Sequence, residues 1–385
     1  MRFLLDAEQR AFAASLDAML TSADTPSIVR AWAGGDHAPG RALWSRLADA
    51  GVFALAVPEA YEGVGPLPVE LALACVELGR HAVPGPVAET LAVAALLSEL
   101  SRLGEPGPAE RLLPALASGK SVTTLVLSGG DAPEAGTSSS SGSHAPDAGT
   151  SSSSGSHAPD AGTAPPSDGP APCPRAAAPP RGYALDADAA TVLLVVDGDG
   201  LWLASGHGPV RASVDPARRL APIDAGGELL AAGPQVARAA LRASVWARLA
   251  IAAQALGTGL ALLDRTVAYV GQRTQFGVAV GSFQAVKHRL ADAMIALEFA
   301  RPLLFGAALS MAPADVAAAK VTACEAAYAT ARTALQLHGA IGYTAEYDLS
   351  LWFTRARALR SVWGTPAECR AEALAGLSGG GRPRS

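Results

Sequence analysis

Lysine is scarce in this chain of 385 residues, which contains only Lys120, Lys287 and Lys320. Acidic residues slightly outnumber basic ones, so that the formal net charge is −5, and no basic strip with interleaved aromatic residues is visible. Nucleic-acid binding depends on a positively charged surface. We therefore expect no nucleic-acid partner.

Cysteine and long apolar runs are also scarce. The four cysteines are widely scattered and form no Cys-x-x-Cys pair, a pattern that favours neither a zinc site nor a redox motif. We expect no metal site, and we expect the thiols to be reduced in a cytoplasmic protein.

The start of the chain turns acidic at Asp6, too early for a secretory signal. The longest apolar run, Leu91 to Leu97, is too short to cross a bilayer, so we expect no membrane insertion.

Aromatic residues make up 5% of the chain, whereas hydrophobic residues make up 50%. A packed globular protein rich in alanine and leucine is expected, and this composition favours helices. We predict an N-terminal helical domain over residues 1–118. Its helices are expected from an N-cap at Asp6 and from apolar residues at helical spacing, over residues 6–20, 43–50, 69–81 and 87–100.

A tract rich in serine, glycine, alanine and proline follows, from about residue 129 to 181. A short polar unit is repeated within this tract, with His144 and His157 at equivalent positions. Such a composition cannot bury enough apolar surface to offset the entropy of ordering. We predict a disordered surface loop, and we attribute the paired histidines to repeat duplication rather than to metal binding.

Strand-like runs lie on both sides of this tract, over residues 121–127, 191–196 and 201–204. Asp197-Gly-Asp-Gly200 is a hairpin signal between two of them. We therefore predict a small, mostly antiparallel β domain over residues 119–228, interrupted by the loop. After it, long helical patterns predict a C-terminal four-helix bundle over residues 229–377, with a disordered tail over 378–385. The helices of this bundle are expected over residues 236–272, 282–310, 313–338 and 347–362.

Three motifs in this last third suit the binding of a large phosphorylated cofactor. Arg273-Thr-Gln-Phe-Gly277 places a guanidinium and an aromatic ring at the end of a long helix. The guanidinium fork can pair with a pyrophosphate, although an arginine there also complements a helix dipole. Gln284 belongs to the second motif, Ser282-Phe-Gln-Ala285. The third, from Gln336 to Tyr343, is a glycine-bearing break between helices, where the backbone can approach a ligand closely.

These motifs resemble, in order and spacing, the cofactor-binding segments of the acyl-CoA dehydrogenases. Val57-Pro-Glu-Ala-Tyr61-Glu-Gly63 and Val76-Glu-Leu-Gly-Arg80 resemble N-terminal segments of the same family. The resemblance implies a helical domain, a β domain and a helical bundle, in a protein that is mainly α. It also implies FAD as cofactor, an acyl-CoA as substrate, an electron acceptor and a tetramer. The cofactor contacts that it implies are Arg273, Phe276, Gln284, Gln336, Gly339, Ala340 and Thr365.

The residues that match the family's catalytic base are not acidic here. The family removes the α-proton of an acyl thioester with a carboxylate while the β-hydrogen leaves as hydride to the flavin. Trp363 and Ala247 stand at the two places where members carry that glutamate. Glu368 is close, but Thr365-Pro-Ala-Glu368 predicts a capping box. Three further carboxylates are interpreted as exposed or structural: Glu346, Asp348 and Asp292. The catalytic residue is therefore left unassigned.

The β domain also lacks clear versions of the segments that line the flavin ring in the family. A chain that keeps the ADP-clasping motifs and lacks the ring-side ones suits a partner subunit in a mixed tetramer, as in actinobacterial members of the family. A self-sufficient homotetramer stays open, as does flavin-dependent oxidation of another substrate on the same fold. The third alternative is a cofactor-free helical scaffold.

Overall fold

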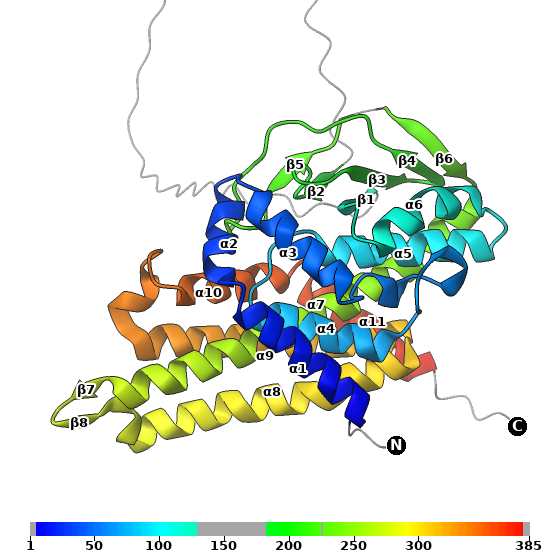
Figure 1. Cartoon of the computed structure of the whole chain (residues 1–385). Coiled ribbons are helices and arrows are strands. Elements are labelled where there is room, and N and C mark those ends of the chain that lie inside the picture. The colour runs from blue at the N-terminus through cyan, green and yellow to red at the C-terminus, as the bar shows by residue number, and fades with distance from the viewer. Residues whose placement is uncertain (1–4, 129–181, 225, 380–385) are drawn as a thin grey trace, which may run out of the picture. The chain divides into compact units, whose positions relative to one another are not determined.

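The structure is a computed structural model that describes residues 5–128, 182–224 and 226–379. These residues belong to one compact unit. Long helices stack against one another in it, and a small sheet covers the shorter helices (Figure 1). The polar repeat tract and the end of the expected tail lie outside the described residues.

The N-terminal part is helical, as predicted. Asp6 caps the first helix through a capping box with Gln9. The prediction missed α2 and α6 and started α3 at Leu43 instead of Ala38. All three helices carry proline in their first turn, where its missing N–H is not needed. The helices are α1 (Ala7–Thr21), α2 (Thr25–Ala33), α3 (Ala38–Asp49), α4 (Pro68–Arg80), α5 (Val87–Arg102) and α6 (Gly107–Ala117). Two 3₁₀ turns, η1 (Ala54–Ala56) and η2 (Glu59–Tyr61), join α3 to α4.

The sheet is mostly antiparallel, as expected, and its strands lie between residues 123 and 232. β1 pairs in parallel with β3, whereas β3–β4 and β4–β6 are antiparallel. Two residues, Gly198 and Asp199, join β3 to β4, and Gly198 has a positive φ of 56°. A second sheet pairs β2 with β5. The strands are β1 (Thr123–Ser128), β2 (Tyr183–Leu185), β3 (Val192–Asp197), β4 (Gly200–Leu203), β5 (Leu220–Pro222) and β6 (Glu228–Ala232).

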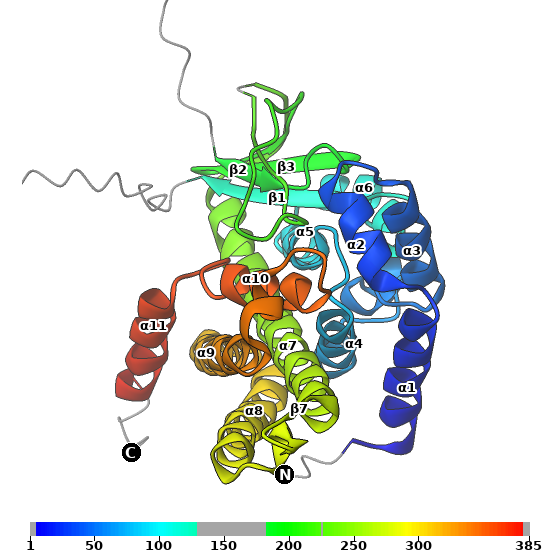
Figure 2. The ribbon, with the colours of Figure 1, turned by 90° about the vertical axis from the view of Figure 1, so that its left-hand side faces the viewer.

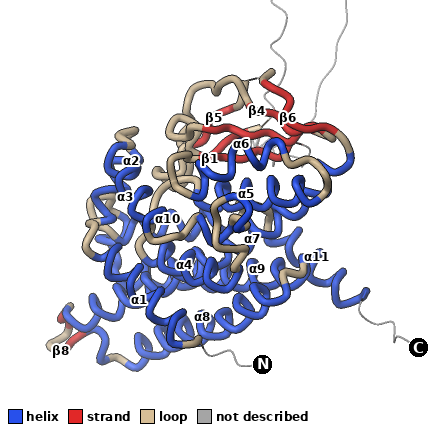
Figure 3. Tube along the Cα trace, turned by 45° about the vertical axis from the view of Figure 1, so that its right-hand side comes forward, coloured by secondary structure: helices blue, strands red, loops and turns tan. Residues whose placement is uncertain are grey.

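Helix α5 lies beneath the sheet (Figure 3) and joins it to the rest of the unit. Its residues from Val87 to Leu97 are all buried, and the Thr90 hydroxyl donates a hydrogen bond of 2.8 Å to the carbonyl of Thr123 in β1. A helix that is apolar all round is expected to be buried on every side. One charged residue, Glu89, lies inside this buried stretch.

The C-terminal part is a bundle of long helices, which confirms the fold class. Its central helix, α7, packs against α4, α5, α8 and α9 (Figure 2). A β-carbon at Gly257 of α7 would lie 1.9 Å from the carbonyl of Val76, so glycine is needed for α4 and α7 to approach closely. The elements are α7 (Pro234–Gln272), β7 (Thr274–Gln275), β8 (Val278–Ala279), η3 (Val280–Ser282), α8 (Gln284–Ser310), α9 (Pro313–His338), η4 (Gly339–Tyr343), α10 (Leu349–Leu359) and α11 (Pro366–Gly379).

Two helices, α7 and α8, are long and apolar enough to cross a membrane by length and composition alone. The apolar stretch of α7 is 89% buried inside the unit, as in the core helix of a globular protein, whereas that of α8 is 39% buried. The exposed apolar residues of α8 include Met294, Ile295, Phe299 and Leu303. This apolar stripe of α8 is not covered by the described residues.

Candidate functional site

Six of the seven predicted cofactor contacts lie in elements at one end of the bundle, around the β7–β8 hairpin (Figure 1), whereas the seventh, Thr365, lies in the link before α11. Arg273 ends α7, and the chain turns back at Phe276 and Gly277, whose φ angles are 56° and 79°. The Phe276 ring is 91% exposed and meets the Phe283 ring, edge to face at 6.3 Å. Such an aromatic face is available to stack on a ligand base.

The Arg273 side chain is exposed, and it is held in place by an aromatic residue. Its guanidinium donates a hydrogen bond to the Tyr269 hydroxyl, one turn back along α7. The Tyr269 ring in turn stacks on the His338 ring at 4.1 Å, and its hydroxyl donates to the His338 carbonyl at 3.3 Å. Arg273 is thereby linked to the break between α9 and η4, which carries the second predicted motif.

At this break the backbone is open. Gly339 has φ 67° and ψ −141°, a conformation that only glycine adopts readily, and a β-carbon there would meet no atom within 4 Å. Gly339 and Ala340 are both exposed. Gln336 is also exposed, and its Oε1 accepts a hydrogen bond of 2.9 Å from Arg289. His338 is buried, and its Nδ1 donates to the carbonyl of Ala334, so its role is packing.

These residues suit the nucleotide half of FAD. A guanidinium fork can pair with a pyrophosphate, an exposed ring can stack on a base, and an open glycine backbone can approach a phosphate. Gln284, the first residue of α8, is exposed on the same end of the bundle. The chemistry of the donors therefore fits, and these residues would hold the ADP part of the cofactor.

A second group of residues lies around Trp363, where the family carries its base. Trp363 has a positive φ of 58° in the link between α10 and α11. Arg248 of α7 donates a hydrogen bond of 2.8 Å to its carbonyl, and the buried Lys320 donates one of 2.7 Å to the carbonyl of Gly364. Ala247 is fully buried beside Arg248. The loop is thus fixed by two cations, while both expected base positions carry apolar side chains.

The Trp363 indole reaches a carboxylate that the sequence analysis did not single out. Its Nε1 donates a hydrogen bond of 3.1 Å to Oε1 of Glu89 in α5. Glu89 is 4% exposed, and its Oε2 has no hydrogen-bond partner among the described residues. The nearest cation is Arg218, whose Nη2 lies 3.8 Å from Glu89 Oε1. The sequence could have indicated Glu89, because a carboxylate inside an apolar helical stretch is expected to be buried. It contains no comparable indication for Arg218.

The other carboxylates near the motif have structural roles. Glu368 and Thr365 form the predicted capping box, with a hydrogen bond of 2.6 Å from the Thr365 N–H to Glu368 Oε2. This backbone hydrogen bond lowers the pKa of Glu368. Asp348 pairs with Arg30 at 2.7 Å, and Glu346 and Asp292 are exposed. Within the described ranges, none of them forms a hydrogen bond or an ion pair with Trp363.

Beside Trp363 lies a cavity of about 460 Å³, called the Arg218 cavity below. The loop before β5 forms one wall, and the end of α10 with the start of α11 forms the other. Its lining residues are Ser213, Val214, Arg218, Leu220, Arg357, Ala358, Arg360, Ser361, Val362 and Pro366. The cavity therefore adjoins the place where the family's base would face a substrate.

The two groups of residues are far apart within one chain. Arg248, which holds Trp363, and Arg273, which belongs to the nucleotide group, are separated by roughly 25 residues of one helix, or about 37 Å. Arg273 and the residues around Trp363 therefore lie at well-separated places along α7.

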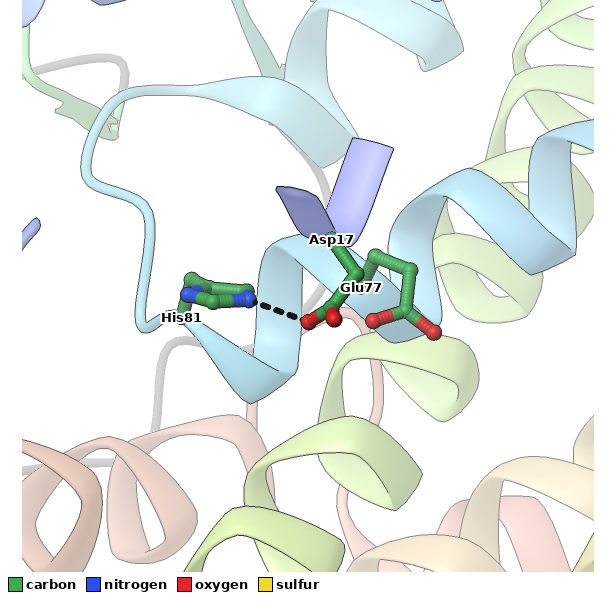
Figure 4. Close-up of side chains that lie close together, drawn as sticks. All are labelled: Asp17, Glu77 and His81. Atoms are coloured by element: carbon green, nitrogen blue, oxygen red, sulfur yellow. Dashed lines mark hydrogen bonds and ion pairs between the residues drawn. The ribbon is translucent and has the colours of Figure 1, made fainter. Parts of the chain in front are cut away.

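One further cluster could in principle hold a metal ion, although the sequence analysis expected none. Asp17, Glu77 and His81 place one possible ligand atom each within 4.8 Å of one another (Figure 4). His81 Nε2 lies 2.8 Å from Asp17 Oδ1, and Arg80 Nε lies 3.6 Å from Glu77 Oε2. An arginine already supplies positive charge there, so we interpret the cluster as a clamp between α1 and α4.

Comparisons with known proteins agree with this description. Residues 6–120 match the acyl-CoA dehydrogenase N-terminal domain, and residues 235–373 match the acyl-CoA dehydrogenase C-terminal domain. Acyl-CoA dehydrogenase IpdE2 of Mycobacterium tuberculosis is 29% identical over 347 residues, which cover 89% of each chain. Two solved structures have similar folds and cover nearly all of both chains. The ChsE4–ChsE5 complex from Mycobacterium tuberculosis has a TM-score of 0.74 at 23% identity, over 98% of this chain and 99% of the other. A variant of the Tcur3481–Tcur3483 steroid ACAD has a TM-score of 0.73 at 25% identity, over 97% and 98%.

The two matched domains together span most of the chain, and the segment between them contains the small sheet that the fold class requires. Relatives in this family bind FAD, and a glutaryl-CoA dehydrogenase from Mycobacterium smegmatis with a similar fold was solved in complex with FADH2. The chain belongs to the acyl-CoA dehydrogenase family of FAD-dependent oxidoreductases.

Proposed function

We propose that this chain is the partner subunit of a mixed tetramer that oxidises an acyl-CoA, or a related acyl thioester, at its α,β-bond. In this tetramer it holds the ADP half of an FAD whose ring lies in a second, glutamate-bearing family member. When bound, FAD supplies the acceptor for the β-hydrogen, which leaves as hydride. An electron acceptor then reoxidises the flavin, and we place the assembly in cytoplasmic lipid metabolism.

The separation of the two groups of residues along α7 carries this proposal. Arg273 lies about 37 Å along the helix from the residues that surround Trp363, so its guanidinium serves an FAD that another subunit shares. The base position of this chain is filled by Trp363, whose indole cannot accept a proton. The subunit that shares the FAD must therefore provide the carboxylate.

Two further observations support an assembly. The apolar stripe of α8 exposes 70% of Phe299 and more than half of Met294 and Ile295, and exposed apolar surface of this kind marks protein interfaces. Among the structural relatives, ChsE4–ChsE5 is a complex of two proteins, and the steroid ACAD carries a paired name.

The test is to purify the chain alone and together with a family member that has glutamate at the position that matches Trp363. We expect little flavin absorbance for the chain alone, and a flavin that is bleached by an acyl-CoA in the mixed assembly. A yellow homotetramer of this chain that reduces its flavin with an acyl-CoA would refute the partner role.

A further inference from the structure

We propose that the Arg218 cavity recognises the carboxylate of an acyl thioester whose acyl part carries a second acid group. This inference takes the class of ligand, an acyl thioester, from the proposed function. The cavity itself belongs to this chain and is separate from the flavin ring of the partner subunit, and the anion-binding role of Arg218 stands on the geometry alone. The cavity adjoins Trp363, and its volume of about 460 Å³ lies in the range of small-molecule sites.

Arg218 is built like a ligand-binding residue. It is 7% exposed, and its guanidinium has no hydrogen-bond acceptor within the described part of the chain. The Glu89 carboxylate at 3.8 Å is too distant for a hydrogen bond. A guanidinium offers five donors, and leaving buried donors unsatisfied is costly. Arg218 is therefore paired by charge with Glu89 but keeps hydrogen-bond donors available to a planar, bidentate anion.

The remaining lining strengthens this preference. Arg357 and Arg360 add two more positive charges, whereas no carboxylate belongs to the lining that the described residues form. Arg360 is paired on its outer side with Glu325 at 2.9 Å, and Arg357 contacts the Tyr328 hydroxyl at 3.4 Å. Hydroxyl groups of two lining serines add polar partners. The cavity thus has an excess of positive charge, which favours an anion.

The chemistry of the lining favours a carboxylate on a hydrocarbon chain. Guanidinium forks match carboxylates and phosphates through two parallel hydrogen bonds. The apolar side chains of Val214, Leu220 and Val362 lie in the same lining and suit a short aliphatic segment. A nucleotide phosphate would offer the same anionic chemistry without that segment, and the experiment separates the two sources.

A substitution of Glu89 tests the proposal, because it should raise anion affinity rather than lower it. Its carboxylate competes with the ligand for Arg218 from behind the cavity. Replacing it in Glu89→Gln removes that competing charge and keeps an oxygen that can accept the hydrogen bond of Trp363. Anion affinity should therefore rise in Glu89→Gln. Arg218→Met alone leaves a buried, uncompensated Glu89 and can unfold the chain, so the informative variant is the neutral pair Arg218→Met/Glu89→Gln.

The experiment is calorimetric titration of the full chain, alone and in the mixed assembly, with glutaryl-CoA and with valeryl-CoA, its neutral analogue of equal length. We expect the wild type to bind glutaryl-CoA about tenfold more tightly or better. Glu89→Gln should widen this ratio, and the double variant should reduce it to about one because its glutaryl-CoA affinity falls.

Equal affinity of the wild type for both thioesters would overturn the proposal. So would Arg218-dependent binding of inorganic pyrophosphate with no preference between the thioesters, because the anion would then be a phosphate. Flavin content reports the proposed function separately. A lost preference in an assembly that keeps its FAD refutes the carboxylate site alone, whereas an assembly without FAD refutes the partner role.

Discussion

The indole Nε1 of Trp363 donates a hydrogen bond of 3.1 Å to Oε1 of Glu89, a residue 274 positions earlier in the chain. This bond joins the α10–α11 link to the buried helix α5. It places a buried carboxylate directly behind the position where the family carries its base. The family's base position is therefore apolar in this chain, and a buried carboxylate accepts a hydrogen bond from the side chain that stands there.

This pairing predicts that restoring the acid at position 363 is costly on its own. Trp363→Glu places a second carboxylate close to buried Glu89, and like charges in such a site destabilise one another. We expect a loss of about 2 kcal/mol or more in the free energy of unfolding, measured by urea titration. Trp363→Glu/Glu89→Gln should recover part of this loss. A single variant as stable as the wild type would show that the two positions do not interact.

The same double variant separates a decayed site from a reshaped one. If only the base has been lost, flavin reduction by an acyl-CoA should appear in the double variant when it is loaded with FAD. If the pocket has been reshaped for another substrate, no reduction should occur even though the flavin is bound. Stopped-flow absorbance of the flavin band distinguishes the two results.

Arg273 should matter for cofactor binding and not for folding. Its side chain is exposed and bonded to Tyr269 one turn away, so Arg273→Gln should leave the melting temperature nearly unchanged. Loss of a charge-assisted contact with pyrophosphate should weaken FAD binding in the mixed assembly by about tenfold or more. Fluorescence titration with FAD measures this. Arg238→Gln, another exposed arginine, is the matched control and should leave FAD affinity unaltered.

Gly339 and its neighbour provide a test of backbone geometry. Gly339→Ala forces a side chain into φ 67°, ψ −141°, at a cost of about 1–3 kcal/mol. Because a β-carbon there meets no atom within 4 Å, the added methyl group should not clash with a neighbour. The backbone between α9 and η4 should instead change its conformation to relieve the strain. FAD affinity should fall with it. Ala340→Gly adds no side chain and should keep FAD affinity. An equal loss of affinity in both variants would contradict the role assigned to the Gly339 backbone.

The loop that carries Arg218 is anchored by a buried ion pair. Arg355 Nε lies 2.5 Å from Asp215 Oδ2, and Arg355 Nη1 donates a hydrogen bond of 3.0 Å to the carbonyl of Val83. Asp215→Ala leaves a buried arginine unpaired and should destabilise the chain by about 3–5 kcal/mol in urea unfolding. Asp215→Leu/Arg355→Met removes both charges and should cost less. A double variant that is less stable than the single one would refute the assigned role of the pair.

Glu77 should make stability depend on pH. Burial, the largest cause, raises the pKa of Glu77 from about 4.5 to about 7. In this range the unfolded chain is ionised and the folded one still holds the proton, so stability falls as pH rises from about 4.5 to about 7 and then levels off. Burial raises the pKa of Asp186 to about 7 as well, so the comparison must be made against Glu77→Gln.

Thermal unfolding of Glu77→Gln should therefore show a weaker loss across this window. The variant should exceed the wild type by about 1–2 kcal/mol above pH 7. Parallel pH profiles for the two proteins would show that Glu77 ionises normally.

Much of the fold could be predicted from the sequence because it depends on local patterns. The alanine-rich periodicity of α7, the Asp6 cap and the glycine turn between β3 and β4 each act within a few residues. The misses at α2 and α6 and the late start of α3 arose at short helices that begin with proline. Such short helices are stabilised by tertiary contacts rather than by their own sequence.

Only the nucleotide part of the candidate site could be predicted from the sequence. Arg273 and Gly339 lie in contiguous motifs of a few residues each, which can be read directly along the chain. Glu89, Arg218 and Trp363 come from three distant segments, and their relationship arises only when α5, the loop before β5 and the α10–α11 link pack together. A glutamate inside an apolar helical stretch indicates a buried charge, but the sequence does not show which residues it contacts.

The central claim is that Arg273 and the Gly339 break of this chain hold the adenylate of an FAD that belongs to a neighbouring subunit. A cryo-electron microscopy map of the assembly with its glutamate-bearing partner tests this most directly. We predict density for an ADP moiety between Arg273 and Gly339 of this chain, with the flavin ring in the partner. Protein atoms filling that place, with no room for a nucleotide between the chains, would contradict the claim.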